Sequence, residues 1–398
     1  MKNTLNLKKI QLTATQLSNA TEGQRDLFLK FLSKTLIERQ SKIIEANKKD
    51  VNASKKKGLP SAFIERLVLD EKAIQLLVLK LENIAKLQSH LGKVVEENSD
   101  EQGLTIKKVR VPLGVIAIIY EARPEVTIDV AALCVKSGNA VILKGGSEAV
   151  ETNKILYHCI LAALEKAGFA REVVSFISSS DRKITDNLLK QHKYIDLVIA
   201  RGGYELARSV LHKSMIPVLA HAAGGARIYI DKSADTFLAQ KIIINAKTSK
   251  PSACNSIDTI VVHKDIANDF ISDITNALKK ANVEVMSNED WDKEFLGLSI
   301  NIKIVKDIDE AISFINEHSK KHSEGIIATD KNVIEQFMNS VDSAALFANC
   351  STRFHDGYVF GLGSEMGIST SKLHARGPVG LKELMTYKWE VYGNGHIR

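Results

Sequence analysis

Hydrophobic and polar positions follow two different periods along the chain, and the change between them divides the sequence. Over residues 21–88 apolar residues recur every three or four positions, for example at Phe28, Leu32 and Leu36. This spacing places them on one face of a helix, so it predicts a helical N-terminal layer. After Val109 the pattern changes to short apolar runs separated by longer segments of helical period. This alternation of apolar runs and helical segments is typical of a parallel sheet covered by helices.

The short apolar runs predict a doubly wound α/β unit, in which ligands bind at the carboxyl ends of the strands. Its strands are expected at residues 115–119, 140–143, 173–177, 195–199 and 217–219, and its helices at 127–136, 148–166 and 204–212. A second α/β unit is expected to begin near Ile228, with a strand at 259–262 and helices at 234–247, 266–281, 308–318 and 333–340. The aromatic tail from Tyr387 is β-prone, and we expect it to pair outside its own domain.

Composition narrows the classes of function. The 398 residues, 44% of them hydrophobic, suffice for two domains with a large core. The net charge of +7 is scattered, and the densest basic run, residues 55–57, has no aromatic neighbours that could stack on bases. The apolar runs are too short to span a bilayer, and the N-terminal residues lack the apolar region of a signal peptide. We therefore expect a cytoplasmic protein without a nucleic-acid or membrane partner.

The four cysteines are far apart in sequence, which argues against a zinc site or a disulfide framework, and we expect no metal. Cys134 and Cys159 lie on apolar helix faces and are predicted to be buried, whereas Cys350 lies in a polar loop and stays ambiguous. Cys254 follows a helix and Pro251 on a loop of small and polar residues with cations nearby. Such a setting favours a reactive thiolate.

Two glycine turns each follow an apolar strand and precede a helix. They consist of Lys144, Gly145, Gly146 and Ser147, and of Arg201, Gly202 and Gly203. Backbone N–H groups and a cation at such a junction suit the phosphate or ribose of a nucleotide. The alternative is that the tight turns alone require glycine. The G-x-G-x-x-G spacing is absent, so an ordinary dinucleotide fingerprint is not supported.

Long strings of residues carry a more specific signal. They cover residues 58–70, 111–124, 136–149, 245–255 and most of 351–389. In these strings the chain resembles the γ-glutamyl phosphate reductases, also called glutamate-5-semialdehyde dehydrogenases, a branch of the aldehyde dehydrogenase superfamily.

The resemblance implies an aldehyde-dehydrogenase-like α/β fold. Residues 1–230 would form a doubly wound cofactor-binding domain, residues 231–375 an α/β catalytic domain, and residues 376–398 a segment that returns to the cofactor domain. Residues 104–112 and the aromatic tail would form a small β oligomerisation flap. A homodimer or a dimer of dimers is then expected.

The resemblance also implies an activity: NADPH-dependent reduction of L-glutamyl 5-phosphate to L-glutamate 5-semialdehyde and phosphate, in proline biosynthesis. Cys254 would be the nucleophile that forms a thioester, because a thiolate is both a strong nucleophile and a good leaving group. Backbone N–H groups of its loop and the Asn245 side chain would stabilise the oxyanion. Asn245 could equally be a helix residue that makes an ordinary hydrogen bond.

The cofactor would be NADPH/NADP. Members of the superfamily that prefer NAD carry a glutamate where this chain has Ser147, and the loss of that negative charge favours a 2′-phosphate. Glu294 aligns with the superfamily glutamate that holds the nicotinamide ribose, although an acidic residue on a solvated helix is the alternative.

The substrate is anionic at both ends, and guanidinium groups suit carboxylates and phosphates. Candidate arginines within the matched strings are Arg123, Arg353 and Arg376. Further candidates are Ser369, Thr370 and His374. Each of them could instead form internal ion pairs or cap a helix.

The chain departs from relatives at several positions. Hydrolytic aldehyde dehydrogenases carry a glutamate base where this chain has the stretch that begins at His221, so water is expected to be a poor acceptor. Ala226 and Arg227 replace a Cys-His pair, and Cys350 replaces an alanine.

The acyl phosphate would come from a separate glutamate 5-kinase, and direct contact between this protein and that kinase is a hypothesis. Two other functions stay open: an oxidative dehydrogenase for another semialdehyde, and a non-enzymatic protein that retains the fold.

Overall fold

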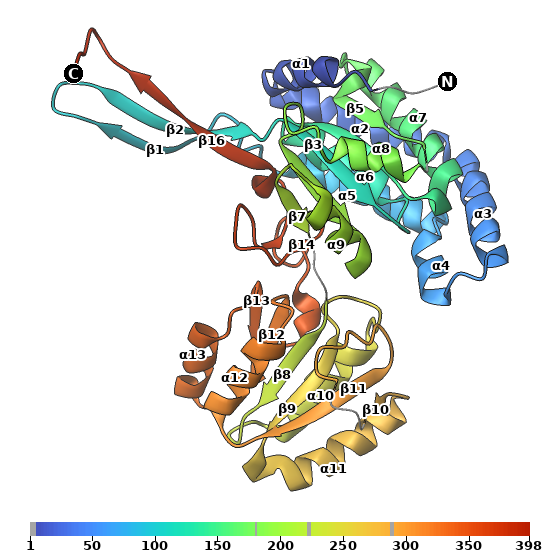
Figure 1. Cartoon of the computed structure of the whole chain (residues 1–398), viewed down its shortest axis with the longest axis vertical. Coiled ribbons are helices and arrows are strands. Elements are labelled where there is room, and N and C mark those ends of the chain that lie inside the picture. The colour runs from blue at the N-terminus through green and yellow to red at the C-terminus, as the bar shows by residue number, and fades with distance from the viewer. Residues whose placement is uncertain (1–4, 180, 221–223, 287–289) are drawn as a thin grey trace. The chain divides into compact units, whose positions relative to one another are not determined.

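The computed structural model describes residues 5–179, 181–220, 224–286 and 290–398 (Figure 1). The chain forms two compact units. The first comprises Met1–Ala220, Gly361–Gly367 and Val379–Arg398, and the second comprises His221–Phe360 and Ile368–Pro378. The sequence-based boundary after residue 230 therefore falls inside the second unit.

Helices form the N-terminal part of the first unit, as the apolar spacing predicts. They are α1 (Leu7–Ser18), α2 (Glu22–Glu38), α3 (Gln40–Lys56), α4 (Ser61–Leu67) and α5 (Glu71–Lys86). Thr21 caps α2 by accepting a hydrogen bond from Gln24 N, and Asp70 caps α5 in the same way at Ala73 N. Helix α1 was not predicted, because it precedes the helical layer expected from residue 21.

A five-stranded parallel sheet forms the core of the first unit, in the order β5-β4-β3-β6-β7. The strands are β3 (Val115–Tyr120), β4 (Ala140–Lys144), β5 (Val174–Phe176), β6 (Leu197–Arg201) and β7 (Val218–Ala220). The helical elements that follow β3 are α6 (Val126–Lys136), η1 (Ser147–Ala149), α7 (Val150–Lys166), η2 (Arg171–Val173), α8 (Arg182–Leu188) and α9 (Tyr204–Lys213). β3 and β4 are buried along their whole length. This confirms the five predicted strands and the doubly wound α/β class, with shifts of one or two residues at the ends of the strands.

A six-stranded parallel sheet forms the core of the second unit, in the order β10-β11-β9-β8-β12-β13. Its strands are β8 (Ala226–Ile230), β9 (Ile257–His263), β10 (Glu284–Val285), β11 (Ser299–Val305), β12 (Ser323–Ile327) and β13 (Ala345–Ala348). Its helices are α10 (Thr236–Thr248), α11 (Lys264–Lys280), α12 (Ile308–His318), α13 (Lys331–Ser340) and the short η3 (Thr352–Phe354). Because β8 is a central strand of this sheet, residues 226–230 belong to the second unit.

The second unit also contains a short hairpin of β14 (Ile368–Ser369) and β15 (Gly377–Pro378). One apolar cluster packs α10 and α11 on the six-stranded sheet through Ile243 and Phe270, and another packs α12 and α13 through Phe314 and Phe337. The sheet is therefore covered by helices on both faces, as its near-continuous apolar strands require.

A three-stranded antiparallel sheet extends from the body of the first unit (Figure 1). Its strands are β1 (Val94–Ser99), β2 (Thr105–Pro112) and β16 (Met385–Tyr392), which follows η4 (Lys382–Leu384). The aromatic tail thus pairs with β2 of its own chain, with Tyr387 opposite Arg110 and Trp389 opposite Lys108. The side chains of Tyr387 and Trp389 remain about half exposed.

Candidate active site

In the first unit, three loops meet at the carboxyl edge of the five-stranded sheet, after β3, β4 and β6. Glu121 Oε1, in the loop after β3, accepts a hydrogen bond from Gly203 N at 2.6 Å. In the same loop Ala122 N donates to Glu148 Oε1 at 2.5 Å. The loop after β3 is therefore tied to both predicted glycine turns. Glu121 and Glu148 were not predicted as site residues, although both lie in the matched strings.

Close packing restricts three of the predicted glycines. A Cβ atom at Gly145 would overlap Asn153 Nδ2, and one at Gly146 would overlap the Glu148 carboxylate. A Cβ atom at Gly202 would stand 2.6 Å from Leu206 Cδ2 and 2.7 Å from Glu121 Oε1. A larger residue at these positions would have to displace a neighbouring side chain, whether or not a nucleotide binds.

Polar side chains of the two turns lie in different environments. Lys144 is buried at the end of β4, donates to Gly145 O at 2.7 Å, and has a pKa lowered by burial. Ser147 is exposed. Arg201 is half-buried and packs beside Gly367, where an added Cβ would lie 3.4 Å from its Cδ. The first turn thus exposes the neutral side chain of Ser147 to solvent, whereas the second turn carries the half-buried Arg201.

Arg123 also lies at this edge of the sheet. Its Nη1 is 4.0 Å from Glu125 Oε1, and both side chains are about 30% exposed. Burial raises the pKa of Glu125, and the Arg123 charge opposes that change. Arg123 thus takes part in a loose ion pair with a neighbouring carboxyl group.

Part of the matched string at residues 136–149 has a structural role. Lys136 is fully buried and forms ion pairs with Glu22 at 3.1 Å and Asp26 at 2.5 Å. Asn139 accepts from Gly114 N and donates to Leu384 O, both at 2.8 Å. These residues hold the sheet to α2 and to the C-terminal segment.

In the second unit, Cys254 lies on the loop between α10 and β9, at the amino edge of the six-stranded sheet. Its carbonyl oxygen accepts a hydrogen bond from Gly225 N at 2.8 Å, and the residue is only partly buried. Among the other cysteines, Cys134 and Cys159 are buried, as predicted. Burial raises the pKa of Cys159 to about 11 and that of Cys134 further. Cys350 is half-buried with a raised pKa.

Glu294 lies against the cysteine loop. A Cβ atom at Gly224 would overlap Glu294 Oε1 and stand 2.7 Å from Cys254 Cβ. The carboxylate and the cysteine therefore border the same small space. The stretch 221–223, which includes His221, lies outside the described residues.

Arg353 is held next to the cysteine loop by short-range contacts. It lies in η3, where its Nε donates to Ser249 Oγ at 3.2 Å. The neighbouring Thr352 Oγ1 donates to Asn255 O at 2.7 Å, and Asn255 Nδ2 donates to His355 O at 3.0 Å. Arg353 interacts electrostatically with Cys254, and burial lowers the pKa of the guanidinium. A cation in this position favours the thiolate form of a cysteine.

The remaining predicted residues of the second unit lie in two places. Asn245 is exposed in the last turn of α10, the helix that leads into the cysteine loop. Ser369, Thr370, His374 and Arg376 lie in or beside the hairpin loop between β14 and β15. Ser369 is buried, Thr370 is partly buried and His374 is exposed.

Arg376 forms an internal ion pair. Its Nη1 is 2.8 Å from Asp342 Oδ1, and the same carboxylate lies 2.9 Å from Lys372 Nζ and 3.3 Å from Lys321 Nζ. These cations hold the pKa of Asp342 well below its usual range, with the hydrogen bond from Lys372 as the main cause. This is the alternative that the sequence analysis left open for each arginine.

Two buried ion pairs beneath the cysteine loop were not predicted. Arg227 Nη1 is 3.5 Å from Glu324 Oε1, with both side chains at most 2% exposed, and Lys247 Nζ is 3.2 Å from Asp258 Oδ1. Burial raises the pKa of Glu324 to about 7 and also raises that of Asp258. The available signal was Glu324, an acidic residue directly before the short apolar run of residues 325–328.

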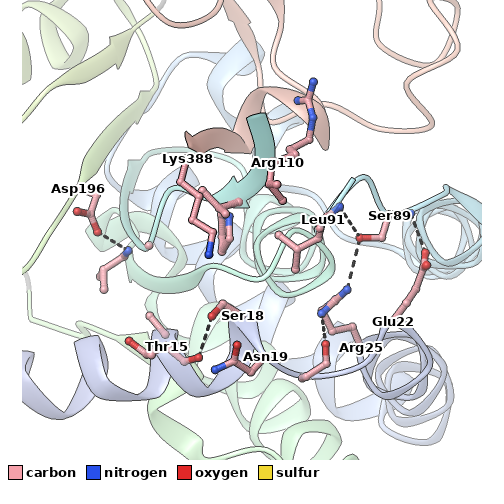
Figure 2. Close-up of a pocket in the computed structure, with 18 of the residues that line it drawn as sticks. Thr15, Ser18, Asn19, Glu22, Arg25, Ser89, Leu91, Arg110, Asp196 and Lys388 are labelled. Atoms are coloured by element: carbon pink, nitrogen blue, oxygen red, sulfur yellow. Dashed lines mark hydrogen bonds between the residues drawn. The ribbon is translucent and has the colours of Figure 1, made fainter. Parts of the chain in front are cut away.

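A cavity of about 670 Å³ in the first unit lies away from the glycine turns. It is bordered by α1, α2, β2 and Asp196, at the amino edge of the five-stranded sheet (Figure 2). Arg25 is buried there and donates to Ala20 O and Ser89 Oγ. The cavity contains none of the predicted site residues.

No helix in the described part of the chain is both long and apolar enough to cross a membrane.

Comparisons with known proteins place this geometry in a family. The model of the aldehyde dehydrogenase family matches residues 34–294. The γ-glutamyl phosphate reductase of Petrotoga mobilis is 43% identical over 98% of this chain and 97% of its own length. The γ-glutamyl phosphate reductase of Clostridium tetani is 42% identical, with the same two coverages.

Solved structures agree with these matches. The crystal structure of γ-glutamyl phosphate reductase from Thermotoga maritima is similar with a TM-score of 0.95 and 39% identity, over 98% of each chain. An acetylating aldehyde dehydrogenase from Geobacillus thermoglucosidasius shares the fold, with a TM-score of 0.72 and 17% identity over 98% of this chain and 96% of its own. The chain belongs to the aldehyde dehydrogenase family, and within it to the γ-glutamyl phosphate reductases.

Proposed function

We propose that the protein reduces L-glutamyl 5-phosphate to L-glutamate 5-semialdehyde and phosphate with NADPH, through a thioester on Cys254, in proline biosynthesis. The proposal depends chiefly on one observation: a partly exposed cysteine stands beside the cation of Arg353, in a chain that is similar to γ-glutamyl phosphate reductases over nearly its full length.

The chemistry assigned to the cysteine is covalent catalysis. The Cys254 thiolate attacks the acyl carbon, the C–O bond to phosphate breaks, and phosphate leaves with the electron pair. After reduction of the thioester, the hemithioacetal oxyanion re-forms the carbonyl group and expels the thiolate, which releases the aldehyde. Backbone N–H groups of the cysteine loop and Asn245 are the proposed donors to the oxyanion at both stages.

The first unit offers a donor set that fits a dinucleotide. Lys144 and the backbone N–H groups of Gly145 and Gly146 stand where a helical segment opens, a favourable environment for phosphate or ribose. The turn of Arg201, Gly202 and Gly203 precedes α9 in the same way. When bound, NADPH supplies the hydride that reduces the thioester. The neutral, exposed Ser147 favours NADPH over NADH, and Glu294 is the proposed contact to the nicotinamide ribose.

For the substrate we propose Arg353 as the anion-binding residue nearest to the nucleophile, with Arg123 as a second candidate. Ser369, Thr370 and His374 remain candidates for the polar groups at the far end of the substrate. Arg376 would act mainly through its ion pair with Asp342, by holding the hairpin loop that carries them.

A second candidate function is oxidation of another semialdehyde to its acid. One observation favours it: the Glu294 carboxylate borders the same space as Cys254, and a carboxylate beside a thioester can activate water. The test supplies glutamate 5-semialdehyde and NADP, with and without phosphate, and follows the absorbance of the reduced cofactor. A rate that depends on phosphate supports the reductase, whereas an equal rate without phosphate supports the oxidative enzyme. No reaction in either case contradicts the reductase and any oxidation of this semialdehyde.

We further propose that the sheet of β1, β2 and β16 mediates assembly into a homodimer or a dimer of dimers. Its half-exposed aromatic side chains are typical of residues that become buried at an interface. Sedimentation velocity at micromolar concentration would contradict this if the protein sediments as a monomer.

Two proposals concern the protein's surroundings. Glutamate 5-kinase would supply the acyl phosphate, and because such compounds are labile, direct contact with the kinase is proposed. Failure of the two proteins to co-sediment would remove that contact. A cytoplasmic location is proposed as well, and cell fractionation tests it.

A further inference from the structure

Glu294 lies in a segment that has no regular secondary structure of its own. Residues 290–298 belong to no helix or strand, yet the carboxylate of Glu294 packs against Gly224 and the Cys254 loop. A side chain must be held to within a fraction of an ångström to act in a reaction. Contacts from outside the segment therefore have to fix its position.

Arg227 provides one such contact from the centre of the six-stranded sheet. Its Nη2 donates to Trp291 O at 2.8 Å. The arginine is itself fixed from the adjacent strand, because its backbone N donates to Glu324 Oε2 at 2.7 Å and its Nη1 lies 3.5 Å from Glu324 Oε1. Ser319 Oγ donates to the same carboxylate at 2.6 Å. The guanidinium thus links the sheet to the start of the segment.

The second buried ion pair holds the other end. Phe295 N donates to Asp258 Oδ1 at 3.4 Å, and Lys247 Nζ lies 3.2 Å from the same oxygen and donates to Ile257 O at 2.9 Å. A Cβ atom at Gly225 would stand 2.6 Å from Asp258 Oδ2. Hydrogen bonds therefore hold the backbone on both sides of Glu294, at Trp291 and at Phe295. Asp258 also packs against Gly225, whose N–H donates to Cys254 O.

It is unusual for buried ion pairs, here Arg227–Glu324 and Lys247–Asp258, to hold a segment in place. An ion pair in a sheet core is often no more stabilising than apolar residues of similar volume, because both charges lose their hydration. Other contacts also reach the segment. At its ends, Asn301 Nδ2 donates to Asp290 O at 3.1 Å and Glu284 N donates to Leu298 O at 2.8 Å. Between them, the Trp291 ring packs edge-on against Phe314, and Asp292 forms a partly exposed ion pair with Lys320 at 2.8 Å, which is expected to be weak.

We propose that Arg227, with Glu324, is a positioning residue that presents Glu294 to Cys254. The inference depends on the proposed function, in which Cys254 is the nucleophile. It adds a role for an arginine whose side chain is buried in the six-stranded sheet. Because Arg227 acts through Glu294, substitution of Arg227 should not change the reactivity of Cys254 further once Glu294 has been substituted.

The experiment is a double-mutant cycle read out by alkylation of Cys254 with iodoacetamide at pH 7. This reaction needs neither substrate nor cofactor, so its outcome is independent of whether the chain reduces glutamyl phosphate. The variants are Glu294→Gln, Arg227→Met/Glu324→Gln and the combination of all three substitutions. Pairing Arg227→Met with Glu324→Gln avoids leaving a buried charge without its partner.

We expect Glu294→Gln to change the alkylation rate by on the order of tenfold, Arg227→Met/Glu324→Gln to change it by a similar factor, and the triple variant to change it no further. Lys320→Met, which removes the exposed ion pair to the same segment, should leave the rate unchanged. The proposal would be overturned if the rate change in the triple variant equalled the product of the changes in Glu294→Gln and in Arg227→Met/Glu324→Gln. It would also be overturned if either of those two variants reacted at the wild-type rate. If circular dichroism shows that Arg227→Met/Glu324→Gln is unfolded, Arg227→Lys replaces it. That variant keeps the charge but loses the fork that reaches Trp291 O, and the same outcomes apply.

Discussion

Gly224→Ala should disable the active site while the protein stays folded. The glycine stands directly before the Gly225 N–H that bonds to Cys254 O at 2.8 Å. An alanine methyl group would overlap Glu294 Oε1 and stand 2.6 Å from Cys254 Cα and 2.7 Å from its Cβ. Carbon atoms in proteins pack at about 3.5–4.0 Å. The loop or the carboxylate must therefore move by about an ångström.

The size of the effect follows from that displacement. Overpacking of this kind costs about 1–3 kcal/mol of unfolding free energy, which a domain of ordinary stability tolerates. A shift of about 1 Å at the nucleophile, in contrast, lowers turnover by on the order of 10²-fold. We expect kcat to fall by that factor, with a cooperative unfolding transition retained.

The assay measures kcat from the phosphate-dependent reduction of NADP and the free energy of unfolding from urea titration. Gly23→Ala is the matched control, because an added Cβ there has nothing within 4 Å and the residue lies in the first turn of α2. That control should keep full activity and gain up to about 1 kcal/mol of stability. A Gly224→Ala enzyme with wild-type kcat would refute the reasoning, because the cysteine loop would then tolerate displacement.

Three further predictions concern single residues. Cys254→Ala should abolish turnover but leave NADPH binding, measured by fluorescence titration, nearly intact; residual turnover above a few per cent would contradict the thioester. Ser147→Glu should raise the KM for NADPH by on the order of tenfold and leave the KM for NADH nearly unchanged, and an equal rise in both would count against a 2′-phosphate contact. Burial lowers the pKa of His355 to about 4, so this histidine is neutral in the folded state at pH 7. The unfolded chain binds the extra proton below about pH 6.5, so the free energy of unfolding should fall by about 2 kcal/mol between pH 7 and pH 5. Urea midpoints should show a flatter pH profile for His355→Gln than for the wild type, and parallel profiles would oppose this assignment.

Strands buried on both faces were the most predictable part of the fold. β3 and β4 are continuous apolar runs, and such runs have few other stable arrangements in a chain of this length. Helix α1 was missed because its buried residues Ile10, Ala14 and Leu17 are mixed with many polar ones. The boundary after residue 230, which the family resemblance implied, lies one strand beyond the division between the units, whereas the apolar pattern placed the start of the second unit near Ile228, within β8.

The candidate site was predictable only where chemistry is local. Cys254 could be singled out from its own loop, since proline and small polar neighbours indicate irregular backbone. The relation of Glu294 to Cys254 and the bond from Arg227 to Trp291 O join residues far apart in sequence. They arise from the order of strands in the second sheet, and no residue spacing encodes that order. Arg376, in contrast, resembled an anion-binding residue by type, but the structure gives it an acidic neighbour, Asp342.

The late position of β16 in the chain has a consequence for synthesis. Strand β2 has its full complement of neighbours only when Met385–Tyr392 pairs along it, and Leu384 O accepts hydrogen bonds from Leu113 N and Asn139 Nδ2 in the same unit. While the ribosome is still making the second unit, one side of β2 offers unpaired backbone groups to any passing strand. A nascent chain of this protein therefore carries an open strand edge until Met385–Tyr392 emerges, and a chaperone would be most useful to it during that interval.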